Sequence, residues 1–124
     1  MIDKLEYLDD GDTKYPMAFT INVMEAAEEE YGGLENWAKL MDSSEPSYKA
    51  LKFMVLEIIN EGIDIENEKL KDDKKKDALT SKQVGRLITR IGLEEIGMKV
   101  FNLIKESLPK GDKSKNVKAM KGLK

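Results

Sequence analysis

The sequence predicts a mainly α-helical chain with a short N-terminal β-hairpin, an α+β fold in which four to five helices form a small bundle. Three observations support this fold class. Apolar residues recur every three to four positions from residue 22 onward. Glycine and proline interrupt that pattern at short intervals. The preceding residues instead alternate between apolar and polar around a turn-forming Asp-Asp-Gly-Asp segment.

The composition bounds the size of the protein and the chemistry open to it. The chain has 124 residues, of which 40% are hydrophobic and 36% charged, enough for one modest core beneath a strongly charged surface. It contains no cysteine and no histidine. These two residues supply most thiolate and imidazole metal ligands, the Ser-His and Cys-His nucleophile systems and the commonest general base. We therefore expect a protein that is not an enzyme, with no cofactor and no catalytic or metal site.

The first residues give no sign of a targeting segment. They read Met1-Ile2-Asp3-Lys4 and lack the apolar run of a signal peptide. No segment approaches the roughly 18 consecutive apolar residues that a membrane-spanning helix needs. The sequence therefore predicts a soluble, cytoplasmic protein that does not bind a membrane.

Charge is unevenly distributed along the chain. The net charge is −3, but residues 110–124 carry six lysines against one acid, Asp112, and the rest of the chain carries 15 basic and 23 acidic groups. We expect a single helical domain with its hairpin over residues 1–108, followed by a flexible lysine-rich tail over residues 109–124 that has too few apolar groups to fold alone. Because the body is acidic, we do not expect it to bind nucleic acid.

The predicted hairpin occupies roughly residues 2–19. Residues 9–12 place three acids around a glycine, which is a strong turn signal. After the turn, Tyr15, Met17 and Phe19 share one face by the period of two that is typical of a strand. Two short antiparallel strands are therefore expected.

A pair of glycines separates the next two predicted helices. Asn22 is a preferred N-cap residue and Glu25 stands three positions later, the spacing of a capping box, so we expect the first helix to begin at Asn22. Gly32 and Gly33 end it, because glycine readily adopts the left-handed conformation at a helix C-terminus. A shorter helix is predicted over residues 34–41.

The most apolar segment, residues 47–61, predicts the helix at the centre of the core. Gly62 is expected to end this helix. Residues 64–77 are highly charged and predict an exposed connection. The apolar stripe of the central helix consists of Leu51, Phe53, Met54, Val55, Ile58 and Ile59.

Two further helices are predicted before the tail. Thr80 or Ser81 can cap the first of them, and Gly92 breaks it. The last helix runs from about Leu93 to Leu108. The apolar positions of the two helices are Val84, Leu87, Ile88, Ile91, Ile96, Val100, Phe101, Ile104 and Leu108.

The helix–glycine–helix pattern also has alternative interpretations. It resembles a helix-turn-helix, so a small nucleic-acid-binding regulator that uses the C-terminal helices or the basic tail is the alternative function. The second of these helices begins Leu93-Glu94-Glu95, however, and its acids would repel phosphate. An enzyme built on carboxylates would need a buried acid with a strongly raised pKa, and no carboxylate spacing supports one.

The order of the signals along the chain is itself informative. A hairpin with the sequence of residues 8–19 leads directly into a helix at Thr20-Ile21-Asn22, which ends Glu28-Glu29-Glu30-Tyr31-Gly32-Gly33. An apolar helix and a charged loop precede the sequence Leu79-Thr80-Ser81-Lys82-Gln83-Val84-Gly85-Arg86-Leu87-Ile88. Over roughly residues 4–108, this order resembles the phage tail assembly chaperone family of long-tailed phages and prophages.

The resemblance implies a non-catalytic, protein-binding role in building the phage tail. Chaperones of this family bind and solubilise the tape-measure protein and help to recruit tail-tube subunits around it. They are helical, often self-associate and need no cofactor. The expected partners are thus a tape-measure protein, a tail-tube protein and further copies of the chain, in the cytoplasm of the host bacterium.

Five residues are predicted to contribute to the partner-binding or self-association surface. A protein that shields apolar helices is expected to present an apolar groove to them. The apolar stripes of the central and last helices look larger than the core requires. We therefore predict that Trp37 and Met41 on the short helix, with Phe101, Ile104 and Leu108 on the last one, contact the partner.

Overall fold

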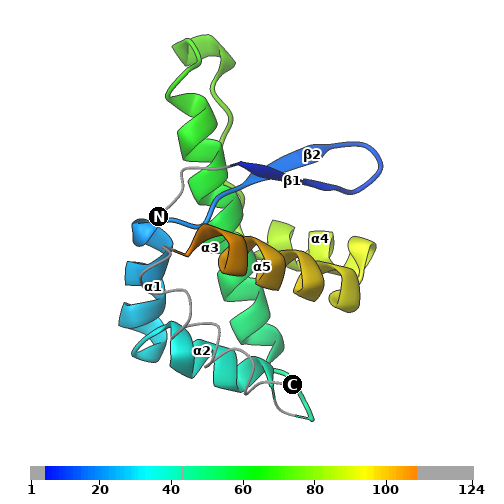
Figure 1. Ribbon diagram of the computed structural model, residues 1–124. Helices are drawn as coiled ribbons and strands as arrows, with labels where there is room; N and C mark the ends of the chain where they lie inside the picture. Colours follow the sequence, from blue (N-terminus) through cyan, green and yellow to red (C-terminus); the bar gives the residue numbers. More distant parts are fainter. Residues whose placement is uncertain (1–4, 43, 109–124) are drawn as a thin grey trace.

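A computed structural model of the protein describes residues 5–42 and 44–108 (Figure 1). The predicted tail over residues 109–124 lies outside the described residues. Within them the fold is the predicted α+β arrangement of a two-stranded antiparallel hairpin followed by five α-helices. The elements are β1 (Glu6–Asp9), β2 (Lys14–Met17), α1 (Ile21–Tyr31), α2 (Leu34–Met41), α3 (Tyr48–Asn67), a 3-10 turn η1 (Asp72–Lys74), α4 (Ser81–Ile91) and α5 (Leu93–Ser107).

The predicted hairpin is confirmed, and its turn is stabilised by the acids that predicted it. Glu6 pairs with Met17 and Asp9 with Lys14. The Asp9 carboxylate accepts a hydrogen bond from the Gly11 amide at 2.8 Å, and Asp10 accepts from the amides of the next residues of the turn. Gly11 has a φ of 102°, a conformation that glycine adopts readily.

The start of α1 differs from the prediction. Thr20 rather than Asn22 is the N-cap, and its hydroxyl accepts a hydrogen bond from the Asn22 amide at 3.2 Å. The Asn22 side chain instead donates to the Glu61 carboxylate at 2.9 Å, and the Thr20 hydroxyl donates to the same carboxylate. A distant acid thus binds the Asn22 side chain, which the sequence spacing assigned to a local capping box with Glu25. The predicted end is confirmed, with Gly32 in the left-handed conformation at φ 82°.

The central helix α3 is longer than predicted because Gly62 does not end it. Ser47 caps the helix by accepting the Ala50 amide, and the helix then continues six residues beyond the predicted end at Glu61, as far as Asn67. At Gly62 the chain of β2 crosses so closely that an added Cβ would lie 2.5 Å from the carbonyl carbon and oxygen of Pro16. Glycine serves close approach here, not termination.

The connection between α3 and α4 is exposed, as predicted, but shorter. Its first residues belong to α3, and it contains the single turn η1. Two asparagines of α3 hold it. Asn67 exchanges hydrogen bonds with the backbone of Lys76 at 2.9 Å, and Asn60 does so with the backbone of Leu79 at 2.8 and 3.1 Å.

The last two helices follow the prediction closely. Thr80 is the N-cap of α4, and it forms a complete capping box with Gln83. Gly92, at φ 109°, ends α4 and begins α5. Leu108 is the residue after α5 and is buried.

The core is arranged around α3, which contacts β2, α1, α2, α4 and α5 (Figure 1). In Figure 1 the hairpin crosses α3, with α1 and α2 at one end of the molecule and α4 and α5 beside each other. The largest fully buried side chains come from β1, the segment between β2 and α1, and all five α-helices: Leu8, Phe19, Val23, Trp37, Met54, Val55, Ile58, Ile59, Leu87, Ile96, Leu103 and Ile104.

Candidate protein-binding groove

An apolar groove lies where the first turns of α3 face α4 and the α4–α5 junction. It has a volume of about 470 Å³. We call it the α3–α4 groove. Its lining residues are Tyr48, Leu51, Lys52, Gly85, Ile88, Thr89, Gly92 and Leu93.

The floor and the rim of the α3–α4 groove differ in exposure. Leu51 and Ile88 form the floor and are only 4% and 7% exposed, because they also belong to the core. Tyr48 and Leu93 stand at the rim and are 71% and 50% exposed. Single exposed apolar residues are common, but two of them beside an apolar hollow mark a surface suited to a protein partner.

Gly85 keeps the middle of the groove open. It lies inside α4, where glycine is about 1 kcal/mol less favourable than alanine. A Cβ at this position would meet only the Lys52 side chain, with Cδ at 3.5 Å, which is ordinary contact. The fold of the chain therefore does not require glycine here.

The groove lies beside a basic helix. α4 carries Lys82, Arg86 and Arg90 and no acid. Arg90 is engaged within the fold, since its guanidinium contacts the Asp10 carboxylate of the hairpin turn at 3.2 Å. Backbone amides of the turn and this guanidinium together lower the pKa of Asp10. Within the described residues, Lys82 and Arg86 make no ion pair.

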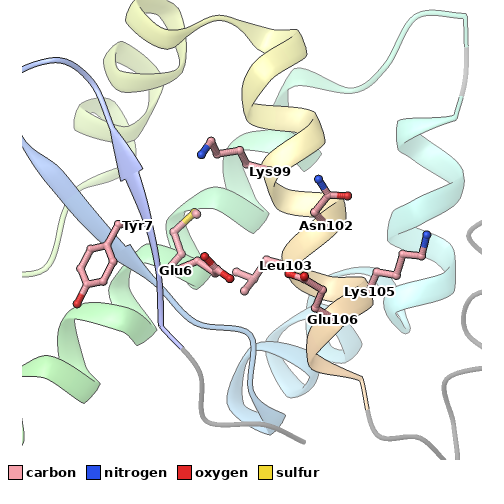
Figure 2. Close-up of a pocket in the computed structure, with 8 residues that line it drawn as sticks. Glu6, Tyr7, Lys99, Asn102, Leu103, Lys105 and Glu106 are labelled. Atoms are coloured by element: carbon pink, nitrogen blue, oxygen red, sulfur yellow. The ribbon is translucent and has the colours of Figure 1, made fainter.

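A second cleft, between the hairpin and α5, is polar (Figure 2). It measures about 420 Å³ and is lined by Glu6, Tyr7, Met17, Lys99, Asn102, Leu103, Lys105 and Glu106. Its two acids and two lysines give no net charge. Figure 2 shows Tyr7 turned away from α5, and its hydroxyl donates a hydrogen bond to Glu66 at 2.8 Å, which raises the pKa of Tyr7. This cleft is more polar than the α3–α4 groove and shows no charge preference.

Of the five residues predicted to bind a partner, three are buried and two are partly exposed. Trp37 is fully buried, donates from Nε1 to the Ala50 carbonyl at 2.9 Å, and contacts the ring of Phe101 with centroids 5.6 Å apart. Ile104 and Leu108 are 0% and 2% exposed, whereas Met41 and Phe101 are partly exposed. Their partner-binding role stays a prediction, and for the three buried residues it requires a rearrangement that exposes their side chains.

Two neighbouring acids of α3, Glu57 and Glu61, are half-buried. Burial, reinforced by the neighbouring Glu61, raises the pKa of Glu57 on α3. Glu61 is occupied by the hydrogen bonds from Thr20 and Asn22. No group of three acids that could hold a metal ion occurs over residues 5–42 and 44–108. The same residues contain no helix of the length and apolarity needed to cross a membrane.

Sequence reasoning missed the groove because its residues give separate, weak signals. Leu93 lies at a helix start, Tyr48 falls outside the apolar stripe of α3, and Gly85 is a single glycine in a helical pattern. The glycine was the usable signal, since an interior glycine lowers helix stability and often marks a close approach.

Comparison with known proteins gives no relative: no protein-family model, no curated protein and no solved structure matches the chain. The fold and the groove therefore define only a class of protein. It is a small α+β protein with a helical core and an apolar groove beside a basic helix.

Proposed function

We propose that the protein is a phage tail assembly chaperone that binds and solubilises the tape-measure protein in the host cytoplasm and helps to recruit tail-tube subunits, a non-catalytic role. The observation that carries the proposal is the α3–α4 groove, an apolar hollow with Tyr48 and Leu93 exposed at its rim. The order of sequence signals, which resembles that of these chaperones, supports the same function.

The groove suggests how an apolar helix is shielded from water. An amphipathic helix presents apolar side chains at positions i, i+3 or i+4, and i+7, along one stripe. Leu51 and Ile88 form an apolar floor for such a stripe, and Tyr48 and Leu93 can cover its sides. Burial of apolar surface contributes about 25 cal/mol per Å², so binding that covers the apolar stripe of the partner lowers the tendency of the partner to aggregate.

Co-expression with the tape-measure protein of the same genome tests the proposal. The full chain carries an affinity tag, and the soluble tape-measure protein is quantified after purification. We expect the wild-type chain to bring it into the soluble fraction, and the double variant Tyr48→Asp/Leu93→Asp to fail. Met98→Asp is the matched control, because Met98 is 61% exposed and lines neither cleft. A tape-measure protein that remains insoluble with the wild-type chain contradicts the proposal.

A nucleic-acid-binding regulator is the second candidate, and the three bases of α4 favour it. The apolar lining of the groove favours a protein partner instead. Titration of duplex DNA at increasing salt separates the two. A regulator binds with an affinity that falls steeply with salt, whereas a chaperone of the proposed kind does not bind DNA.

A further inference from the structure

The helices that form the α3–α4 groove carry basic side chains, although the protein as a whole has a negative net charge. The net charge is −3, yet the groove lining contains one charged residue, Lys52. Residues three and four apart share a helix face, so Lys82 lies on the face of α4 that contains Gly85, and Arg86 lies one turn after Lys82. Lys49 precedes Lys52 by three positions on α3 and is exposed. Lys52 therefore lines the hollow, and three further exposed cations, Lys49, Lys82 and Arg86, lie on the two helices α3 and α4 that form it. The acids Glu94 and Glu95 follow the lining residue Leu93 at the start of α5.

Gly85 adds an independent observation about the shape of the ligand. Alanine would fit at this position and favour the helix, and the glycine leaves only the flexible Lys52 side chain beside the α4 backbone there. Glycine on one helix allows another helix to approach its backbone closely. The apolar floor on either side, Leu51 and Ile88, fits the side chains of such a helix.

Resting on the proposed function, we infer that the segment bound in the α3–α4 groove is an acidic amphipathic helix. Its apolar stripe enters the groove and crosses α4 at Gly85, and its Asp and Glu side chains flank the stripe and pair with Lys49, Lys52, Lys82 and Arg86. Charge complementarity of this kind selects partners and accelerates association. It distinguishes acidic helical segments of the partner from basic ones of equal hydrophobicity.

A second copy of the chain fits the groove less well. Its acidic helix α1 carries four glutamates and no base, which satisfies the charge requirement. Its apolar residues Val23 and Ala27, however, are 1% and 0% exposed because they pack in its own core. Apart from Ile21, which is 64% exposed, little apolar surface remains to enter the groove. The occupant is therefore a segment of another protein.

The test uses two synthetic helical peptides of about 20 residues, long enough to be helical in solution. Both carry the same leucine stripe at helical spacing, and the flanking positions are glutamate in one and lysine in the other. Each is titrated into the full-length ¹⁵N-labelled chain. We expect the glutamate peptide to bind about tenfold more tightly, a difference of about 1.4 kcal/mol, and to shift the amide signals of Leu51, Gly85 and Ile88. Equal affinities, or shifts confined to other residues, overturn the inference.

Two variants locate the binding site. Lys82→Glu/Arg86→Glu is expected to abolish the preference between the peptides, because it sets two new acids against the remaining Lys49 and Lys52. Both replaced side chains are exposed and unpaired within the described residues. Gly85→Leu is expected to weaken binding of the glutamate peptide about tenfold. Gly97→Leu is the matched control, because it also lies inside a helix but a Cβ there meets nothing within 4 Å. An unchanged affinity in Gly85→Leu, with the fold intact by circular dichroism, contradicts the inference.

The outcomes separate this inference from the proposed function. If the tape-measure protein co-purifies equally with the wild-type chain and with Gly85→Leu, the chaperone function stands and the groove assignment is wrong. If the glutamate peptide binds as expected but the tape-measure protein stays insoluble, the groove assignment stands and the proposed function is wrong. Concentration-dependent self-association that Gly85→Leu abolishes, or duplex DNA that displaces the peptide, also overturns the inference.

Discussion

The helix contacts at Gly62 and at Gly85 place the same residue type in the middle of a helix for different reasons. At Gly62 the backbone of β2 already fills the space, and an added Cβ would lie 2.5 Å from Pro16. At Gly85 the space beside the helix is open except for the flexible side chain of Lys52. The first glycine is a requirement of the fold. The second keeps a hollow that the chain itself does not fill, which is what a binding groove needs.

The charged residues of α3 also differ between the part of the helix near Gly62 and the part beside the groove. The part near Gly62 carries Glu57 and Glu61, and Glu61 is held by hydrogen bonds from the start of α1. The opposite end carries Lys49 and Lys52 beside the groove. One end of the central helix is thus committed to contacts within the chain, and the other end is left with cations at the surface.

The largest expected effect comes from closing the space at Gly62. Gly62→Ala places a methyl group against the backbone of Pro16, which cannot move aside as a side chain would. We expect a loss of about 3 kcal/mol in the free energy of unfolding, measured by urea denaturation. Gly97→Ala, in open space, is the control. A Gly62 variant as stable as the wild type would show that β2 can move away from α3. Gly62 would then not be required by the fold, and the contrast with Gly85 would be lost.

A smaller effect of opposite sign is expected at Gly85. Gly85→Ala improves helix propensity without a close contact, so the free energy of unfolding should rise by up to about 1 kcal/mol. Gly97→Ala should stabilise the chain by a similar amount. Thermal and urea unfolding of both variants measure the effect. Destabilisation by Gly85→Ala alone would mean that this glycine, like Gly62, is required for packing.

The smallest expected effect concerns the acidic part of α3. Because the pKa of Glu57 is raised above its ordinary value of 4.5, the folded state binds its proton more tightly than the unfolded chain does. Stability attributable to Glu57 is therefore highest below pH 4.5 and is lost as pH rises through the raised pKa. We expect Glu57→Gln to be more stable than the wild type at pH 7 and the difference to vanish below pH 4.5. Unfolding measured across this range tests the sign, with Lys49→Gln as an exposed control.

Much of the fold could be predicted from local sequence signals. Asp9 and Asp10 predicted the hairpin turn because their side chains bind the backbone of that turn. Gly32 and Gly92 predicted helix ends because both adopt positive φ. Thr80 was one of two predicted caps, and Gln83 completes its capping box. These signals act within a few residues, and neighbouring elements do not override them.

The errors arose where distant residues decide the local structure. Asn22 has the residue type and spacing of an N-cap, but Glu61 binds its side chain across 39 positions of sequence. The predicted binding role of Trp37, Ile104 and Leu108 is not such an error and stays a prediction, although all three residues are buried. Apolar periodicity is the same whether a stripe faces a partner or the core. Periodicity reports which residues share a face, and only packing shows what covers that face.

The sequence by itself determined the α+β class, the hairpin, the order of five helices and most of their ends, because caps, turns and apolar periodicity are local properties of the chain. The tertiary structure alone decided that Gly62 continues a helix beneath a crossing strand and that Tyr48, Gly85 and Leu93 meet around one hollow. These are consequences of residues far apart in sequence approaching within a few ångströms. Local free energies specify the elements, whereas the position of the groove depends on how those elements pack.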